Sequence, residues 1–313
     1  MADTAKQLNQ ERIERLSAEP FVDMNPPPGV MRGAWASLRD IAQHHQLLGL
    51  MTRREIRAKY KNSALGLAWS LARPLVSLLI YYLVVGQFLG AGRGIHNFAI
   101  YVFAGLTAWG LFNDIILSST SSLVVNAGII KKTKLPREIF PLASTGSALF
   151  NLVIQMLILI LGAILVGGIN QHLTVWTALY LPAALLLLTV WALALGMILG
   201  AVNVYMRDIQ FLVEVLLQIG FWMSPVVYSW QMVNNWGNSN GTLGSIVSSL
   251  YLANPATLGV LGMRRVMWND QGTANDPSFL GLRIAIALVV GLVVLFMAQR
   301  IFNRLQRNFA QEL

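Results

Sequence analysis

Long apolar runs recur along the chain, separated by more polar connectors. The runs cover roughly 66–90, 98–122, 140–168, 175–203, 209–229 and 281–301. At about 1.5 Å per helical residue, each run can cross a hydrocarbon layer of about 30 Å. The third, fourth and sixth runs contain almost no charge. The pattern predicts an all-α polytopic membrane protein with six transmembrane helices.

Basic residues in the connectors indicate the orientation of these spans. Those at the predicted cytoplasmic ends are Lys131, Lys132, Lys134, Arg137, Arg207, Arg300, Arg304 and Arg307. The connector between the third and fourth runs has no Lys or Arg. Because connectors rich in these residues stay on the cytoplasmic side, we expect both termini in the cytoplasm.

The segment between the last two runs is external on this topology, yet it holds apolar and aromatic stretches. Pro225, the pair Asn254-Pro255 and several glycines divide it into short pieces. We therefore expect one or two short re-entrant helices at about 229–268, dipping into the outer leaflet. Arg264 and Arg265 are expected at the level of the outer headgroups.

Three regions follow from composition along the chain. Residues 1–34 are charged and then proline-rich, which predicts a mobile cytoplasmic tail. Residues 35–65 predict an amphipathic interface helix, because Arg53, Arg57 and Lys61 recur on one face. A solvated charged helix is the alternative. Residues 66–313 form the expected transmembrane domain.

Composition places most side chains away from water. Hydrophobic residues make up 55% of the chain and charged residues 12%, against roughly 25% charged in soluble domains. The net charge is +9, and the basic residues lie beside apolar runs, where they suit anionic lipid headgroups better than nucleic acid. The chain has no cysteine, which excludes disulfides and thiolate metal sites.

Enzymatic signatures are scarce. The chain has no G-x-x-x-x-G-K-[ST] phosphate loop and no H-E-x-x-H pair, and its four histidines lack metal-ligand spacing. We therefore expect no catalytic residue, metal site or cofactor in this chain. If a nucleotide drives transport, ATP and Mg²⁺ belong to a separate ATPase.

Arg73, Asp114 and Glu214 fall inside the predicted spans, where a charge is costly and usually faces a partner or a cavity. Arg73 and Asp114 lie at similar depths, roughly 10 Å and 12 Å from the cytoplasmic ends of their spans. We expect them to approach one another, within or between subunits. Glu214 is a rival partner for Arg73, and snorkelling of Arg73 to phosphates is the alternative.

Aromatic residues gather in or beside the first, second and fifth spans. The candidates for a pore lining are Tyr81, Tyr82, Phe88, Trp109, Phe112, Phe221, Trp222 and Tyr228. Their faces could stack on sugar rings in a pore. The alternative is that they are ordinary core residues or residues of the membrane aromatic belt.

The basic connector from Asn126 to Pro141 combines cations with Ile129, Ile130 and Leu135. It predicts a short helix at about 124–137 on the membrane surface, with a face left over for a partner. A simple positive-inside anchor is equally consistent with its composition.

At these residues the sequence resembles the membrane subunit of polysaccharide ABC exporters, the family that includes O-antigen, capsular polysaccharide and teichoic acid transporters. The resemblance covers nearly everything after about residue 45. It is carried in order by Arg53–Tyr60, Ser63–Trp69, Gly105–Phe112, Asn126–Pro141, Met223–Tyr228 and Leu252–Pro255.

The resemblance implies a homodimer in the bacterial inner membrane, associated with two copies of an ATP-binding subunit. The substrate would be a polyprenyl pyrophosphate-linked glycan. The residues that would couple to the ATPase are Asn126, Ile129, Ile130, Lys131, Lys132 and Lys134. The anionic headgroup would be received by Arg53, Arg54, Arg57 and Lys59. Arg73 departs from the family, which often has an uncharged polar residue there.

Two other functional hypotheses remain open. A permease of the same fold could export a drug or a small lipid. An ion-coupled carrier or intramembrane transferase is less favoured, since Asp114 is the one candidate for a carboxylate near the midplane.

Overall fold

The computed structural model describes residues 39, 42–61, 68–90, 92, 95–133, 135–165, 178–268 and 276–313. The chain divides into two units, residues 1–40 and 41–313. Only Arg39 of the first unit is described, so the predicted tail at 1–34 lies outside the described residues. Every element of the described part is a helix, which confirms the all-α prediction.

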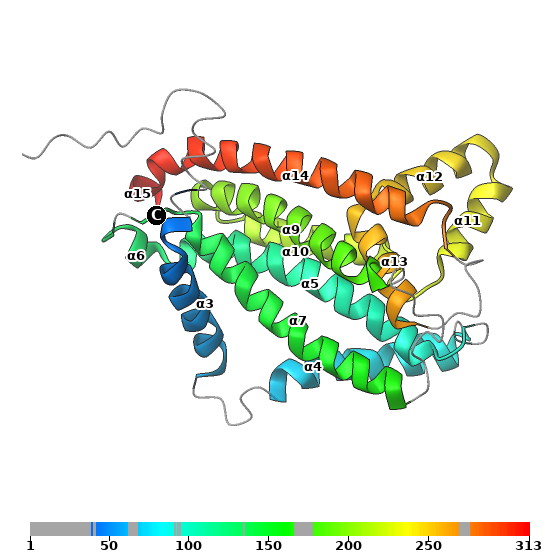
Figure 1. The fold of residues 1–313 in the computed structure, drawn as a ribbon. Helices are drawn as coiled ribbons and strands as arrows, with labels where there is room; N and C mark the ends of the chain where they lie inside the picture. Colours follow the sequence, from blue (N-terminus) through cyan, green and yellow to red (C-terminus); the bar gives the residue numbers. More distant parts are fainter. Residues whose placement is uncertain are drawn as a thin grey trace, which may run out of the picture. The chain divides into compact units, whose positions relative to one another are not determined.

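Four long helices form the body of the second unit (Figure 1): α5 (Phe98–Val125), α7 (Ile139–Leu165), α9 (Tyr180–Tyr205) and α14 (Leu280–Leu305). Helices α5 and α9 pack together at the centre, with α7 against α5 and α14 against α9. Gly196 and Gly200 permit the central contact, since a Cβ on Gly196 would lie 2.6 Å from that of Ser119. Small residues of this kind let helix backbones approach closely in membranes.

Within the described part of the chain, five helical segments are long and apolar enough to cross a membrane. They are the four long helices and the continuous pair formed by α4 (Ala68–Ile80) and the π-helix η1 (Tyr81–Phe88). The helix found in the predicted span at 209–229 is shorter than expected, because α10 (Ile209–Trp222) has 14 residues, or about 21 Å of helix. Pro225 follows within three residues of its end and has no backbone N–H to continue it.

The outer segment forms three helices, where one or two were expected: α11 (Trp230–Ser239), α12 (Gly241–Ala253) and α13 (Pro255–Met267). Helices α12 and α13 meet at a bend of 72° and could count together as a sixth span. Asn254 caps α13 by accepting a hydrogen bond from the Ala256 N–H at 3.0 Å. Helix α13 is largely buried against α5 and α9.

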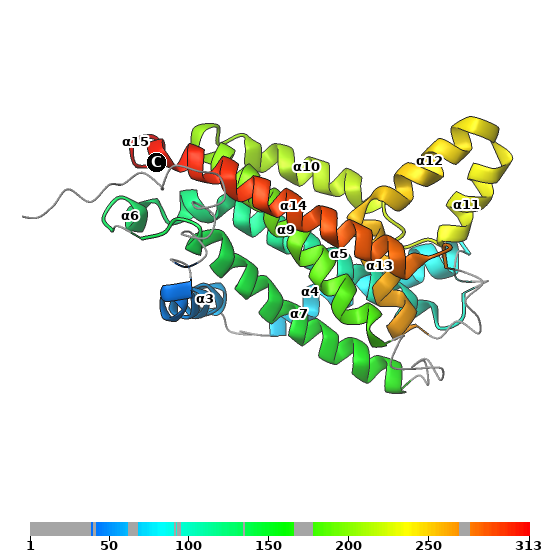
Figure 2. The same cartoon turned by 45° about the horizontal axis from the view of Figure 1, so that its top comes forward.

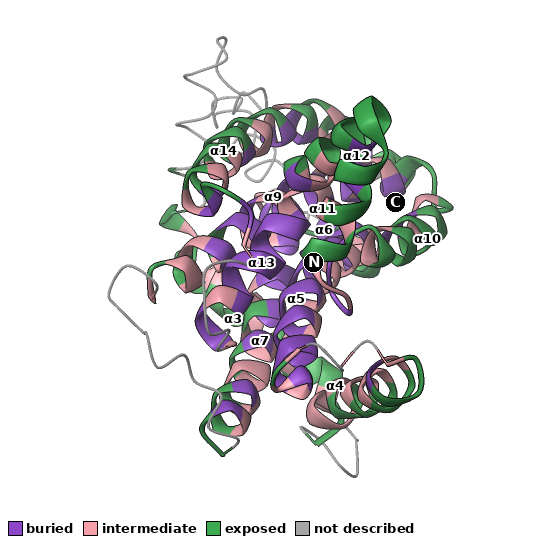
Figure 3. Cartoon of the chain, turned by 90° about the vertical axis from the view of Figure 1, so that its right-hand side faces the viewer, coloured by how far each residue is buried: buried purple, intermediate pink, exposed green. Residues whose placement is uncertain are grey.

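Helices α4 and α10 lie at the margin of the bundle. None of the α4 residues is buried, and Figure 3 shows α4 apart from the buried centre formed by α5 and α13. Helix α10 lies across the bundle from α7 (Figures 2 and 3). Both marginal helices expose large apolar side chains, including Val76, Leu79, Leu212 and Leu216.

The two ends of the unit carry different elements. Helix α6 (Ala127–Ile130) and the C-terminal α15 (Phe309–Glu312) lie at one end, whereas α11 and α12 lie at the other (Figure 1). Helix α3 (His45–Tyr60) begins at the α6 end and packs on α7. The basic connector and the outer helices are thus separated by the length of the bundle.

Candidate functional site

Helix α3, in the expected interface region 35–65, is docked on the bundle by small and polar side chains. Gly146 of α7 leaves room for Thr52, which would lie 2.9 Å from an added Cβ. The Ser144 hydroxyl donates a hydrogen bond to Glu55 Oε1 at 3.0 Å. Burial raises the pKa of Glu55, against the lowering effects of Ser144, Lys59 and Arg54. Helix α3 is therefore anchored to protein by these contacts.

Arg54 links α3 to the start of the basic connector. Its Nη1 donates to Asn126 Oδ1 at 3.0 Å, and Asn126 Nδ2 donates to Ser122 O at 2.9 Å. Arg53, Arg57 and Lys59 are exposed. All four basic residues expected to meet a lipid headgroup are therefore exposed, and one of them, Arg54, also holds the connector.

A polar cluster surrounds Asp114 at the junction of α3, α4, α5 and α7. The side chains of Asn151 and Asn113 lie close to Asp114, and its carboxylate is within electrostatic range of Lys59 and, less strongly, Arg73. Arg73 acts on Asp114 only at electrostatic range, and their close approach stays a prediction. The stronger partner, Lys59, could not be paired with Asp114 from sequence.

The hydrogen bonds around Asn151 give this cluster a defined arrangement. Tyr60 Oη donates to Asn151 Oδ1 at 3.0 Å, which leaves the Asn151 NH₂ group available to donate to another acceptor. Two cations lie within electrostatic range of one carboxylate. Both Lys59 and Arg73 remain exposed, so the cluster presents excess positive charge to an approaching ligand.

Glu214, the rival partner of Arg73, lies elsewhere. It accepts a hydrogen bond from Gln210 Nε2 at 3.3 Å on the exposed face of α10. Gln218, one helical turn further along, is also exposed. Helix α10 therefore presents two polar groups outward from a single copy of the chain.

Four of the predicted pore aromatics form one cluster that joins the first, second and fifth spans. Phe221 of α10 lies 5.7 Å from Tyr81 and 5.9 Å from Trp109, whose ring is 5.8 Å from Phe112. A Cβ on Gly220 would lie 2.9 Å from Trp109, so the glycine permits this packing. Trp109 and Phe112 are buried, which makes them part of the core within one chain.

Of the other predicted aromatics, Trp222 touches this cluster at its margin, with its ring 5.5 Å from that of Phe221. Phe88 is 80% exposed and Trp222 is 55% exposed. Tyr82 contacts Phe98 at 6.5 Å. Tyr228 belongs to the outer network, where its hydroxyl donates to Trp222 O at 2.6 Å. Within one copy of the chain, Phe88 and Trp222 are the rings open to a ligand.

Arg264 was expected at the level of the outer headgroups. Its side chain is 3% exposed, so its partners lie within the protein. It donates from Nε to Tyr101 O at 3.1 Å, from Nη1 to Tyr101 Oη at 2.7 Å, and from Nη2 to Val226 O. The guanidinium also lies 3.6 Å from the centre of the Tyr101 ring. Carbonyl oxygens and a ring therefore replace lipid phosphates as its partners.

The same network continues to the re-entrant helices. Tyr101 Oη donates to Tyr228 O at 2.8 Å, and Tyr251 Oη donates to Tyr228 Oη at 2.9 Å. Arg265 pairs with Asp276. A cation inside the apolar stretch Leu250–Met267 was the sequence signal for this network, but the acceptors come from distant segments.

The basic connector is less helical than the predicted range of about 124–137. Helix α5 extends to Val125, and α6 covers only Ala127–Ile130. Ile130 is buried in the core, whereas Ile129 is only partly buried and Lys131 and Lys132 are exposed. Lys134 lies outside the described residues. The surface open to a partner is therefore formed by Ile129 and the two lysines.

One catalytic spacing does occur in the sequence, since Gly237–Gly241 reads G-x-S-x-G. A nucleophile elbow requires a strand-to-helix turn, whereas Ser239 ends α11 and donates its hydroxyl to Asn235 O at 2.9 Å. The described residues contain no group of three His, Asp or Glu side chains that could hold a metal.

Comparison with known proteins gives a consistent result. The sequence pattern of ABC-2 type transporters matches residues 46–268. The chain is 27% identical over 278 residues to the O-antigen export system permease protein RfbA of Myxococcus xanthus, covering 88% of this chain and 98% of that protein. It is 25% identical over 265 residues to the protein of the same name from Klebsiella pneumoniae, and this alignment covers 85% of this chain and 94% of that protein. The chain therefore belongs to the ABC-2 type transporter family.

Proposed function

We propose that this chain is the permease subunit of an ATP-driven exporter, which moves a lipid pyrophosphate-linked polysaccharide outward across the bacterial inner membrane. The names of its relatives from two bacteria support a polysaccharide cargo. The alternative is an ABC-2 permease of the same fold that exports a drug or a small lipid. ATP and Mg²⁺ would be held by a separate ATP-binding subunit.

The observation that carries the proposal is the excess of cations around Asp114. Lys59 and Arg73 are exposed and lie within electrostatic range of one carboxylate, while Arg53 and Arg57 add exposed cations on another face of α3. Phosphate oxygens form short, charge-assisted hydrogen bonds with such side chains. A pyrophosphate headgroup could therefore bind Lys59 and Arg73 while its lipid tail stays in the membrane beside α4.

The glycan would pass between two copies of the chain. Glu214 and Gln218 lie on the exposed face of α10, and polar groups in a membrane-spanning helix normally face a partner or a water-filled cavity. Helix α10 adjoins η1 through the Phe221–Tyr81 contact. A homodimer that places these marginal helices around its axis would give the pore polar groups and open rings.

The partner ATPase would bind at the opposite end from α11 and α12. Ile129, Lys131 and Lys132 offer an apolar and basic surface beside Asn126, which Arg54 ties to α3. Movement of the connector could thus be passed to the headgroup site through a direct hydrogen bond. Both termini would then be cytoplasmic.

The test uses charge removal at the headgroup site. Lys59→Gln combined with Arg73→Gln should lower export of the lipid-linked glycan at least tenfold, because two charge-assisted contacts are lost. Lys61→Gln, at the exposed end of the same helix, is the matched control. Glycan on the cell surface and ATPase activity of the purified complex are measured together.

The outcomes separate the candidate functions. Loss of export with the subunits still associated supports the proposal. Normal glycan export in a strain that lacks this chain would reject it in favour of a drug or lipid cargo. Failure of any ATPase to copurify with the chain would also reject it.

A further inference from the structure

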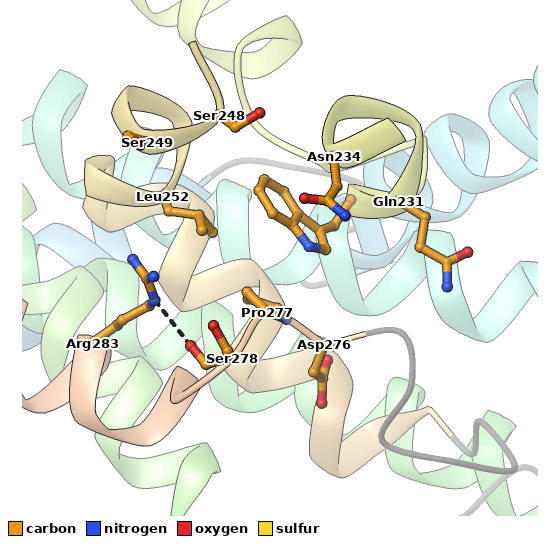
Figure 4. Close-up of a pocket in the computed structure, with 10 residues that line it drawn as sticks. Gln231, Asn234, Ser248, Ser249, Leu252, Asp276, Pro277, Ser278 and Arg283 are labelled. Atoms are coloured by element: carbon orange, nitrogen blue, oxygen red, sulfur yellow. Dashed lines mark hydrogen bonds between the residues drawn. The ribbon is translucent and has the colours of Figure 1, made fainter. Parts of the chain in front are cut away.

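A polar cavity lies at the end of the protein that carries α11 and α12, away from the cluster around Asp114. It has a volume of about 330 Å³ and lies between α11, α12 and the segment that leads into α14 (Figure 4). Its lining is Trp230, Gln231, Asn234, Ser248, Ser249, Leu252, Asp276, Pro277, Ser278 and Arg283. This volume is near the lower end of the range for small-ligand sites.

Several lining groups retain unused hydrogen-bonding capacity. Among the described residues, the side-chain amides of Gln231 and Asn234 make no hydrogen bond, although they lie one turn apart on α11. Each amide offers both a donor and an acceptor. A wall of this kind suits a ligand that carries several neighbouring hydroxyls.

Arg283 supplies a positioned cation on another side of the cavity (Figure 4). Its Nε donates to Ser278 O at 3.0 Å, which fixes the guanidinium and leaves both Nη groups without a partner in the described part of the chain. Asp276, which also lines the cavity, forms an ion pair with Arg265. The cavity therefore accepts neutral or anionic oxygen atoms.

Rigid apolar groups complete the lining. Trp230 is 6% exposed and stacks on Tyr251 with ring centres 5.7 Å apart. Leu252 and Pro277 are buried beside it. A ring with apolar C–H faces and hydroxyl edges matches a site in which an indole and aliphatic groups lie beside amides.

We propose that this outer cavity binds one saccharide unit of the exported glycan after that unit has left the pore. The inference rests on the proposed function, which supplies the glycan and the outward direction. The cavity lies at the end of the bundle opposite α6 and the C-terminus (Figure 1), so the ligand reaches it from the outer side. Binding there would oppose backward sliding of the chain between transport steps.

The experiment uses the complete transporter complex in nanodiscs and, as probe, the delipidated oligosaccharide of the host's exported glycan. Asn234→Ala should weaken its binding about tenfold and Arg283→Gln roughly thirtyfold, as expected for loss of a neutral and a charged hydrogen bond. Asn235→Ala, at the neighbouring exposed position outside the cavity, should leave binding unchanged. Glycerol 3-phosphate serves as a probe for lipid headgroups.

Three results would overturn the inference. Equal saccharide affinity in all variants, or no saccharide binding by a complex that still exports glycan, would reject the cavity as a saccharide site and leave the proposed function intact. Preferential binding of glycerol 3-phosphate would assign the site to lipid. Glycan export that does not depend on this chain would instead reject the proposed function, and with it the exported glycan as the ligand.

Discussion

Glu55 shows how one side chain can make the docking of α3 depend on pH. Its carboxylate is partly buried against α7 and accepts the Ser144 hydroxyl. Burial raises its pKa above the ordinary value of 4.5. As pH rises past 4.5, the unfolded chain releases this proton first, so the folded state loses stability until the pH exceeds the pKa of the folded protein.

Glu55→Gln should therefore raise the melting temperature of the purified protein near neutral pH. The amide oxygen can still accept from Ser144, while the cost of burying a negative charge disappears. The difference from wild type should be close to zero below pH 4.5 and should grow as the pH increases. Thermal unfolding in detergent, recorded from pH 4 to 8, measures it.

The control for this prediction is Glu312→Gln, at an exposed position near the C-terminus. It should show no comparable growth of the difference with pH. If Glu55→Gln changed the melting temperature by the same amount across the pH range, burial of the charge would not be the cause.

Residue chemistry could be predicted from the sequence better than residue partners. Arg73 and Asp114 stand out because charges are costly inside apolar spans. Lys59 does not, since it lies in a basic helix outside the spans and reaches Asp114 only because α3 docks on α7. The acceptors of Arg264, Tyr101 and Val226, could not be predicted because they belong to segments far away in sequence.

At the scale of elements, hydropathy predicts the long spans well because lipid requires continuous helices. Helices α5, α7, α9 and α14 fall where the apolar runs predict them. Helix α10 is shorter because an apolar run does not reveal that its last part is a turn around Pro225. Burial of α13 against α5 and α9 is likewise a tertiary effect.

The contact of α3 with α7 depends on the absence of a side chain at Gly146. In Gly146→Ala, the added methyl would lie 2.9 Å from Thr52 Cγ2 and 3.0 Å from Thr52 Oγ1. Overpacking of this kind costs about 1–3 kcal/mol. We expect a lower melting temperature and weaker protection of α3 from proteolysis.

Two variants make this prediction specific. Gly162→Ala lies on the same helix, and its added Cβ meets nothing within 4 Å; it should be neutral or slightly stabilising. Thr52→Ala should restore most of the stability when combined with Gly146→Ala. Equal destabilisation by both alanine substitutions, or no rescue by Thr52→Ala, would show that the close approach is not the cause.

At the scale of the whole molecule, the margin formed by α4 and α10 is incomplete in a single copy. Lipid can cover its apolar side chains, but it does not satisfy Glu214 and Gln218 on the exposed face of α10. A second copy related by a twofold axis would bring the same surface into a shared interface or pore. Exposed residues on α7 lack such polar neighbours and are better suited to lipid.

The chain contains no cysteine, so single cysteines can test this arrangement directly in native membranes. Leu216→Cys on α10 and Leu161→Cys on α7 replace leucines that are 54% and 58% exposed. If α10 faces the second copy, a short bismaleimide should link Leu216→Cys chains into a covalent dimer and leave Leu161→Cys monomeric. Equal dimer yields would indicate random collision, and a dimer formed only by Leu161→Cys would place the interface on α7. In the latter case Glu214 and Gln218 would need another partner, and the proposed pore between the marginal helices would be excluded.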